Sequence, residues 1–142
     1  MIDTEKAARI LEQHEGNRRY AYTDSVGKLT IGIGFNLDDV GLYPEESQWI
    51  LRNRISKIDT KLINILPEYR GLNAVRRIVL VDMMYNLGQR RFFGFKKMLA
   101  ALQVRDYAEA AKEMLDSKWA RQVGGRSTRL ARIMETGEWY ED

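Results

Sequence analysis

Three side chains near the start of the sequence have the types and the spacing that acid–base chemistry needs. Glu15 and Asp24 lie nine residues apart, and Thr30 follows six residues after Asp24. Cleavage of a glycosidic bond uses two carboxyl groups, because the leaving oxygen needs a proton while the sugar centre needs a negative charge or an activated water. Glu15 and Asp24 can fill these roles, and a hydroxyl such as that of Thr30 can orient the attacking water.

The same residues also have ordinary structural interpretations. Glu15 can pair at the surface with a neighbouring arginine, Asp24 can stabilise a turn that ends at Gly27, and Thr30 can be a plain β-branched strand residue. Because the chain contains 20 acidic side chains, many carboxylate pairs occur at any given spacing. Spacing alone therefore leaves both interpretations open.

The flanking sequence predicts the elements that would position these groups. Asp3 or Thr4 can cap a first helix that ends at Gly16, with an apolar face made by Ala7, Ile10, Leu11 and His14. From residue 20 to residue 37, β-branched and aromatic residues alternate with glycines, which indicates a small antiparallel sheet with tight turns. A hairpin there can bring the helix end, the turn and the next strand together.

The rest of the chain reads as helical. Pro44 suits the first turn of a long helix over about 45–66, whose apolar residues repeat at three- and four-residue steps until Pro67. A helix of about 20 residues spans about 30 Å, enough to connect two lobes. Residues 72–87 are so apolar that we expect a helix buried nearly all round, and amphipathic pieces follow at 92–103, 106–121 and 126–135. The predicted fold class is α+β, mostly helical.

Composition further limits the class of protein and the kinds of site that the chain can contain. With 142 residues, 44% hydrophobic and 30% charged, the chain is typical of one globular domain, and it has no cysteine for a disulfide or a thiolate metal site. We expect no secretory signal and no stable insertion into a membrane. Residues 1–60 carry 8 basic and 10 acidic side chains, while residues 61–142 carry 15 and 10, so the second half suits a negatively charged partner or merely a solvated surface.

Three segments of the sequence carry recognisable motifs. The first joins Glu15-Gly16 to Tyr22-Thr23-Asp24, Gly27 and the run Thr30-Ile31-Gly32-Ile33-Gly34. The second is Arg76-Arg77 with residues 82–88, and the third contains Ser117-Lys118-Trp119, Arg126, Arg129 and Gly137-Glu138-Trp139. Together these segments resemble the phage T4-type lysozyme family. The similarity covers essentially the whole chain and is most specific at residues 15–34.

The resemblance implies a single lysozyme domain over residues 1–142. Its small lobe would span about 15–44, its bridging helix about 45–66 and its helical lobe about 67–142, with residues 1–14 packed on the helical lobe. The expected activity is hydrolysis of the β-1,4 bond between N-acetylmuramic acid and N-acetylglucosamine in peptidoglycan, with inversion at the anomeric carbon. No cofactor and no metal are expected.

The resemblance also assigns roles by position. Glu15 is the expected acid, Asp24 the base or electrostatic partner, and Thr30 the residue that holds the water. Further sugar contacts are expected from Gly34, Asn36, Tyr85 and Asn86, although Tyr85 and Asn86 can equally be helix-end packing. Arg126 is expected to reach Glu15 across a cleft, the alternative being a helix-start arginine that pairs with solvent or Glu135.

Two positions depart from the family's pattern. Phe35 stands where Gly-x-Gly is often followed by histidine, and we expect it in the core. His14 stands next to the expected acid, at a helix end whose dipole favours a cation. The connection between Leu37 and Pro44 is also short, so we expect a smaller upper lobe with one helix fewer.

Other functions remain as alternatives to an active muramidase. A wall-binding module would keep the cleft without turnover, and a lytic transglycosylase would use the acid and release anhydro-muramic products. A nucleic-acid binder would rely on the basic second half, but the sequence has no recognised motif for one. We expect a monomer that binds glycan strands and not nucleic acid, held in a host cytoplasm until a holin or lysis releases it, or carried by a phage particle.

Overall fold

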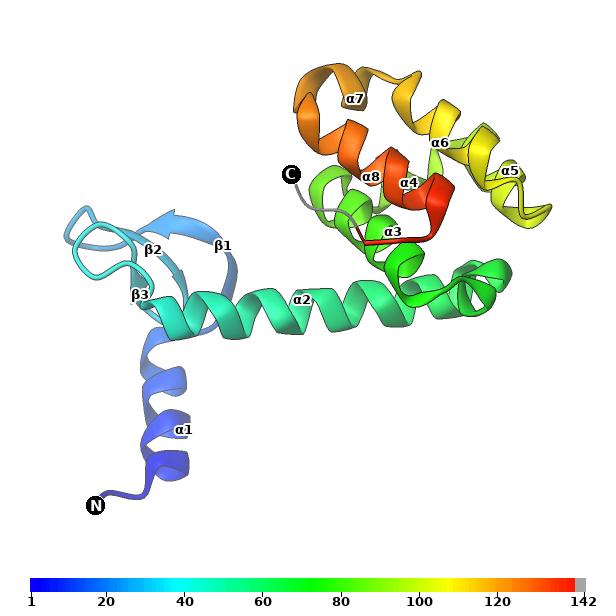
Figure 1. Cartoon of the computed structure of the whole chain (residues 1–142). Helices are drawn as coiled ribbons and strands as arrows, with labels where there is room; N and C mark the ends of the chain where they lie inside the picture. Colours follow the sequence, from blue (N-terminus) through cyan, green and yellow to red (C-terminus); the bar gives the residue numbers. More distant parts are fainter. Residues whose placement is uncertain (140–142) are drawn as a thin grey trace. The chain divides into compact units, whose positions relative to one another are not determined.

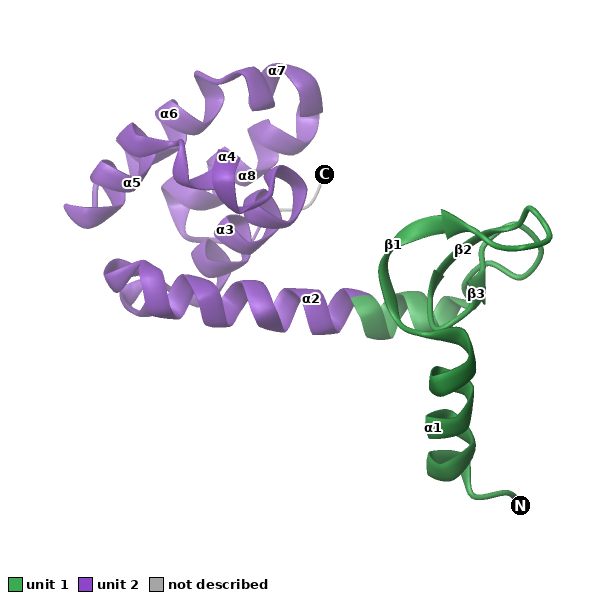
Figure 2. Cartoon of the chain, turned by 180° about the vertical axis from the view of Figure 1, so that it is seen from behind, with its two compact units in different colours: residues 1–50 green, residues 51–142 purple. Residues whose placement is uncertain are grey.

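A computed structural model describes residues 1–139 and has the predicted α+β architecture, mostly helical with a small antiparallel sheet near the N-terminus (Figure 1). The chain divides into two compact units, Met1–Ile50 and Leu51–Asp142 (Figure 2). The boundary falls inside α2 (Pro44–Ile65), the long helix that the sequence predicts at about 45–66. We describe each unit by itself.

The first unit begins with α1 (Thr4–Glu15), which starts and stops where the sequence predicts. The side chain of Asp3 accepts a hydrogen bond from the backbone N–H of Lys6, as an N-cap does. Gly16 ends the helix with φ at +73°, a conformation that favours glycine. No residue of α1 is buried, and the packing of residues 1–14 on the helical lobe stays a prediction.

The sheet follows with β1 (Arg18–Thr23), β2 (Leu29–Gly32) and β3 (Phe35–Asn36), in that spatial order. Both pairings are antiparallel, and they place Tyr22 opposite Thr30 and Thr30 opposite Asn36. Thr30 therefore sits on the central strand, and at 3% exposure it is the one buried residue among residues 1–50.

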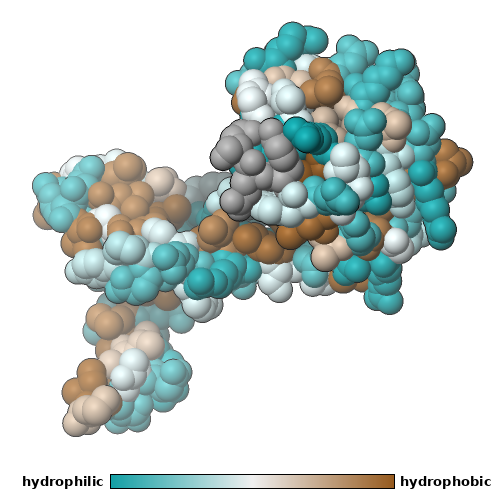
Figure 3. Space-filling view, in the orientation of Figure 1, coloured by the Kyte–Doolittle hydropathy of each residue, from teal (hydrophilic) through white to brown (hydrophobic). Residues whose placement is uncertain are grey.

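The prediction that Phe35 lies in the core is wrong. Its side chain is 48% exposed, and its ring lies over Gly32, where a Cβ atom would come within 2.7 Å of the ring. The reason is that the first 50 residues bury no hydrophobic side chain, so they have no core for this ring to enter. Figure 3 accordingly shows hydrophobic surface on the sheet-bearing unit.

The second unit contains the rest of the helices. After α2 come a 3-10 turn (Pro67–Gly71), α3 (Ala74–Leu87), α4 (Gln89–Phe93), α5 (Lys96–Gln103), α6 (Tyr107–Leu115), α7 (Lys118–Val123) and α8 (Gly125–Thr136). The predicted helix at 92–103 is interrupted between Phe93 and Lys96. The predicted helix at 106–121 is interrupted at Ser117, whose hydroxyl accepts from the N–H of Ala120 and so caps α7.

All buried hydrophobic side chains of the described chain belong to this unit, between Leu62 and Met134. Helix α3 packs mainly against α4 and α8 and buries Val79, Leu80, Met83 and Met84. The expectation that it is buried nearly all round is wrong, because Ile78 and Tyr85 on its other side are 49% and 46% exposed. Because α3 is buried on one side only, side chains near its C-terminal end, such as Tyr85, are accessible to solvent.

Arg76 joins the start of α3 to the end of α8. Its Nε and Nη2 donate to the carbonyl oxygens of Met134 and Glu135, and its guanidinium lies 3.7 Å from the centre of the Tyr107 ring. These contacts satisfy carbonyl groups that the end of a helix leaves unpaired. An arginine thus joins the first and the last of the helices α3 to α8.

Candidate active site

Glu15 is the last residue of α1, and its carboxyl group lies directly against Gly34. A Cβ atom built on Gly34 would stand 2.6 Å from Oε2 of Glu15 and 2.8 Å from its carboxyl carbon. Gly34 belongs to the turn between β2 and β3 and has φ at +65°. The predicted acid and one predicted sugar contact are therefore neighbours, and the carboxyl group occupies the space that a side chain at position 34 would fill.

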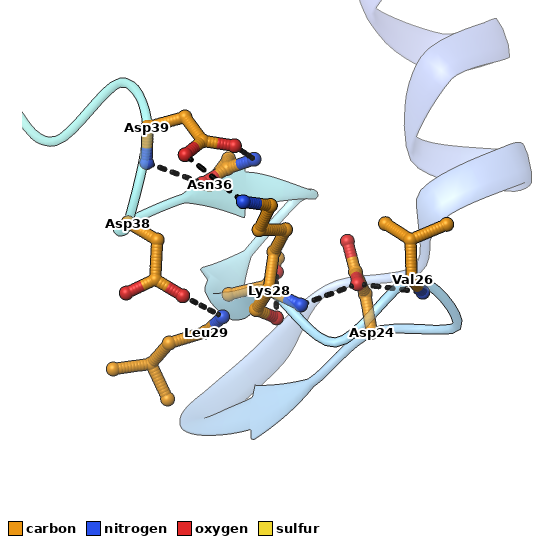
Figure 4. Close-up of polar contacts among 8 residues, drawn as sticks. Asp24, Val26, Lys28, Leu29, Asn36, Asp38 and Asp39 are labelled. Carbon is orange, nitrogen blue, oxygen red and sulfur yellow. Dashed lines mark hydrogen bonds and ion pairs between the residues drawn. The ribbon is translucent and has the colours of Figure 1, made fainter.

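Asp24 occupies the turn between β1 and β2, where backbone donors fix its carboxylate. Oδ1 accepts from the N–H groups of Val26 at 3.0 Å and Lys28 at 2.8 Å (Figure 4). Gly27, with φ at +86°, completes the turn by donating to the carbonyl of Asp24. Both side-chain bonds use the same oxygen, which leaves Oδ2 for a water or a substrate.

Thr30 is bonded to the same residue as Asp24. Its hydroxyl donates to the carbonyl oxygen of Lys28 at 3.0 Å, while the N–H of Lys28 donates to Asp24. Because the hydroxyl proton is committed to a backbone carbonyl, the oxygen of Thr30 can act toward a water only as an acceptor. The two residues predicted to handle the water are thus held by one residue between them.

The side chain of Lys28 also belongs to this arrangement, and the sequence analysis missed it. Its Nζ pairs with Oδ1 of Asp39 at 3.2 Å, and the neighbouring Asp38 accepts from the N–H of Leu29 at 2.7 Å (Figure 4). The consecutive acids at 38 and 39 were the available signal. They fasten the chain after β3 to the start of β2.

Asn36, a predicted sugar contact, has its amide occupied in this region. Its Oδ1 accepts from the N–H of Asp39 at 2.9 Å, and its Nδ2 donates to the Asp39 carboxylate at 3.3 Å. A turn that fixes itself in this way is typical of asparagine after a strand. The structure gives Asn36 a structural role, and its sugar contact stays a prediction.

In the helical unit, Tyr85 and Asn86 form the exposed end of α3. Oδ1 of Asn86 accepts from Nε1 of Trp119 at 2.9 Å, and the indole itself is buried at 3% exposure. An indole N–H can only donate, so this bond determines which end of the amide is oxygen. The Nδ2 donor of Asn86 is left without a protein acceptor within residues 1–139.

Arg126 pairs with Asp82, a partner that the sequence analysis did not name. Nε and Nη2 of Arg126 both donate to Oδ1 of Asp82, at 2.9 Å and 2.5 Å. The pair joins α8 to α3, both within the helical unit. Its predicted contact with Glu15 stays a prediction.

Within residues 1–139, no group of three or more histidine, cysteine or acidic side chains is placed to hold a metal ion. In the same part of the chain, no helix is long and apolar enough to cross a membrane. The site as described consists of carboxylate, hydroxyl and amide groups. Such groups support proton transfer and hydrogen bonding to a neutral sugar.

Comparison with known proteins identifies the class that this fold and site define. Residues 12–133 match the phage lysozyme family, so the chain belongs to that family. Two probable T4-type lysozymes of Dictyostelium discoideum are 27% and 28% identical over 90% and 93% of this chain and 92% and 95% of their own lengths. The family makes the chain a glycoside hydrolase of the lysozyme type.

A longer protein also matches. The pre-baseplate central spike protein Gp5 of Enterobacteria phage T4 is 25% identical over 92% of this chain, which corresponds to 28% of the spike protein. The matched region is therefore one part of that larger protein.

Proposed function

We propose that this lysozyme hydrolyses the β-1,4 bond between N-acetylmuramic acid and N-acetylglucosamine in bacterial peptidoglycan, and so lyses bacteria. The observation that carries the proposal is the shared anchoring of Asp24 and Thr30 on Lys28, in the same unit as Glu15, whose carboxyl group lies against Gly34. Such an arrangement supplies a base, a water-holding oxygen and an acid from three separate elements. Family membership supports the choice of peptidoglycan as substrate.

The proposed mechanism begins with a proton from Glu15 to the glycosidic oxygen. As that bond breaks, positive charge develops on the sugar ring, and a water attacks the opposite face. Oδ2 of Asp24 accepts one proton of this water, and the oxygen of Thr30 accepts a hydrogen bond from the other. Because Oδ1 of Asp24 already holds two backbone donors, Oδ2 is the oxygen that takes the proton. The product has inverted anomeric configuration.

The helical unit contributes binding in this proposal. Asn86 offers its Nδ2 donor and Tyr85 its half-exposed ring, groups that suit the N-acetyl and apolar faces of a sugar. Gly34 and Asn36 are the proposed sugar contacts of the sheet-bearing unit, and Arg126 the proposed cation for Glu15. We propose a monomer with no nucleic-acid partner.

We further propose that the protein acts as an endolysin, kept in the host cytoplasm until a holin or lysis releases it. Delivery on a phage particle is the alternative, and the similarity to a baseplate spike protein supports it. Detection of the chain in purified particles by mass spectrometry would favour delivery, whereas its presence only in the cell extract would favour release.

The substitution Glu15→Gln tests the mechanism in a peptidoglycan-clearing assay. Loss of the acid should lower kcat at least about hundredfold, since positioned proton transfer contributes 10²–10⁴-fold. Retained clearing would sink the proposal. Mass spectrometry of the fragments separates reducing-end products, as expected, from the anhydro-muramic products of a transglycosylase, and NMR of fresh product reports the anomer.

A further inference from the structure

Two hollows lie side by side in the helical unit, with Gly94 in the wall of both. The first has a volume of about 340 Å³, and its lining residues include the apolar Leu87, Phe95 and Trp119 and the basic Arg91 and Lys118. The second, of about 530 Å³, is lined by Gln89, Arg90, Phe93 and Lys96. We call the two together the Gly94 groove. Its lining comes from the end of α3, from α4, α5 and α7, and from the loops that join them, and it contains none of the residues assigned to catalysis.

The charge of the groove is one-sided. Arg91 and Lys118 line the first hollow and Arg90 and Lys96 the second, and no carboxylate lines either. All four cations are exposed, and none pairs with an acidic side chain among residues 1–139. A third hollow, which Gly94 and Lys96 also line, differs because Glu113 and Asp116 are among its lining residues. Four cations without an acidic partner thus line the two hollows of the groove, while the two carboxylates belong to the third hollow around the same glycine.

The helical unit as a whole has the same sign. Residues 51–142 carry 18 basic and 11 acidic side chains, while residues 1–50 carry 5 basic and 9 acidic. A field of this kind concentrates anions near the unit before they reach the groove. The groove therefore lies in the unit that carries the excess of positive charge.

We propose that the Gly94 groove binds a linear polymer of phosphodiesters, such as the poly(glycerol phosphate) of bacterial walls. Two cationic hollows joined at a residue without a side chain suit a chain with repeated charges better than a single anion. Arginine binds phosphate oxygens through two parallel N–H groups, and lysine supplies a point charge, so each hollow holds one cation of each kind. The apolar side chains of Leu87 and Phe95, which also line the first hollow, suit the carbon units between phosphates.

Nucleic acid carries the same phosphates but suits the groove less well. Binding of single strands relies on aromatic rings that stack with exposed bases. Here Trp119 is 3% exposed, and Phe95 packs at right angles against it with the ring centres 6.2 Å apart, so the indole offers little surface on which a base could stack. The choice of a wall polymer rests on the proposed function, which places the protein at the wall.

The test measures binding of a Glu15→Gln protein, which should not digest its target. The probes are isolated poly(glycerol phosphate), walls that carry it, and the same walls after hydrofluoric acid has removed it. Adding Arg91→Gln and Lys118→Gln should weaken binding to the polymer about tenfold at fixed salt, since affinity for a polyanion depends on the number of phosphates neutralised. Binding to the acid-treated walls should not change.

Matched variants distinguish an effect of the groove itself from an effect of the protein's net charge. The double variant Arg54→Gln with Lys57→Gln also removes two positive charges, here from exposed positions of α2, and should change binding less than twofold. Arg91→Lys with Lys118→Arg keeps both charges and should retain most of the affinity. Circular dichroism checks that each variant is folded.

The proposal would be overturned by equal binding to walls with and without the polymer, by an equal loss of binding in the α2 variant, or by tighter binding to single-stranded DNA at equal phosphate concentration. Polyglutamate serves as the carboxylate competitor, and competition as strong as that of the polymer would also contradict a phosphate site. A failure of the proposed function would appear separately, as absent hydrolysis by the protein with Glu15 intact.

Discussion

The carboxyl group of Glu15 rests against the Cα of Gly34, in the space where any other residue would carry its Cβ. The two residues come from different elements, the end of α1 and the turn between β2 and β3. A glutamate at a helix end can adopt many rotamers, and the contact with the backbone of Gly34 restricts the direction in which the carboxyl group of Glu15 points. Because Gly34 has no side chain, the carboxyl group of Glu15 can occupy this position.

Gly34→Ala should therefore lower activity more than stability. The new Cβ would stand 2.6 Å from Oε2 and push the carboxyl group aside, while a positive φ at a non-glycine residue costs about 1 kcal/mol. We expect kcat for peptidoglycan to fall about tenfold or more, since misplacing a reacting group by about 1 Å can cost a hundredfold. Gly41→Ala is the matched control, because Gly41 has φ at +69° and open space around its Cβ position.

If both alanine variants lost the same activity, backbone strain alone would explain the effect, and the contact with Glu15 would have no catalytic role. Urea denaturation of both proteins supplies the comparison. Similar losses of stability with unequal kcat values are the expected pattern.

Two substitutions of Asp24 distinguish the role of its charge in catalysis from its role in stabilising the turn. In Asp24→Asn, the amide oxygen can still accept from the N–H groups of Val26 and Lys28, so the turn should persist. The base is lost, and kcat should drop by about 10²–10⁴. In Asp24→Ala, both backbone donors lose their acceptor, and the free energy of unfolding should fall by a further 1 kcal/mol or so.

The comparison of kcat and urea midpoints for the two variants checks this assignment. An Asp24→Asn protein that clears walls normally would remove Asp24 from the mechanism, and an Asp24→Ala protein as stable as wild type would show that the turn does not depend on the carboxylate.

Sequence and structure agree most closely where local chemistry decides the outcome. The cap at Asp3, the stop at Gly16, the turn at Gly27 and the helix after Pro44 all depend on a few neighbouring residues, and all were predictable. The catalytic candidates were found mainly by resemblance, because 20 acidic side chains offer too many pairs.

Contacts that run through the backbone or depend on packing were missed for a physical reason. Lys28 joins Asp24 to Thr30 through its backbone, which no side-chain pattern reveals, and its Nζ reaches Asp39 only because β2 and β3 fold back together. Phe35 was placed in the core because it is apolar, yet burial depends on what a unit can enclose. The partner of Arg126 likewise required the packing of α8 on α3.

Asn86→Asp tests the predicted sugar contact without disturbing the fold. The aspartate keeps an oxygen acceptor for Nε1 of Trp119 but replaces the Nδ2 donor by a second oxygen. If that donor binds an N-acetyl carbonyl, KM should rise about tenfold, since a lost hydrogen bond with an unpaired partner costs 1–3 kcal/mol, while the melting temperature should barely move. Trp119→Phe is the companion variant, because it should lower stability.

Unchanged KM and kcat in Asn86→Asp would assign Asn86 to helix-end packing, the alternative that its sequence also allows. A variant that melted several degrees lower would instead show that the indole bond needs the amide itself.

Tyr69 contributes stability to the helical unit that is lost at high pH. Burial raises the pKa of this phenol well above its ordinary value, and the hydrogen bond to Asp59 at 2.5 Å raises the pKa further. A group whose pKa is raised on folding contributes stability that is fully present below its unfolded pKa of about 10 and is lost as the pH rises toward the folded value. The unfolding free energy should therefore decline above pH 10.

The variant Tyr69→Phe isolates this contribution. At pH 7 the loss of the hydroxyl should lower the unfolding free energy by about 1–3 kcal/mol, because the Asp59 oxygen loses its donor. Between pH 10 and 11 the gap between wild type and variant should narrow by about 1 kcal/mol, since one pKa unit corresponds to 1.36 kcal/mol. Urea denaturation across that range measures the gap, and a constant gap would mean that the phenol ionises equally in both states.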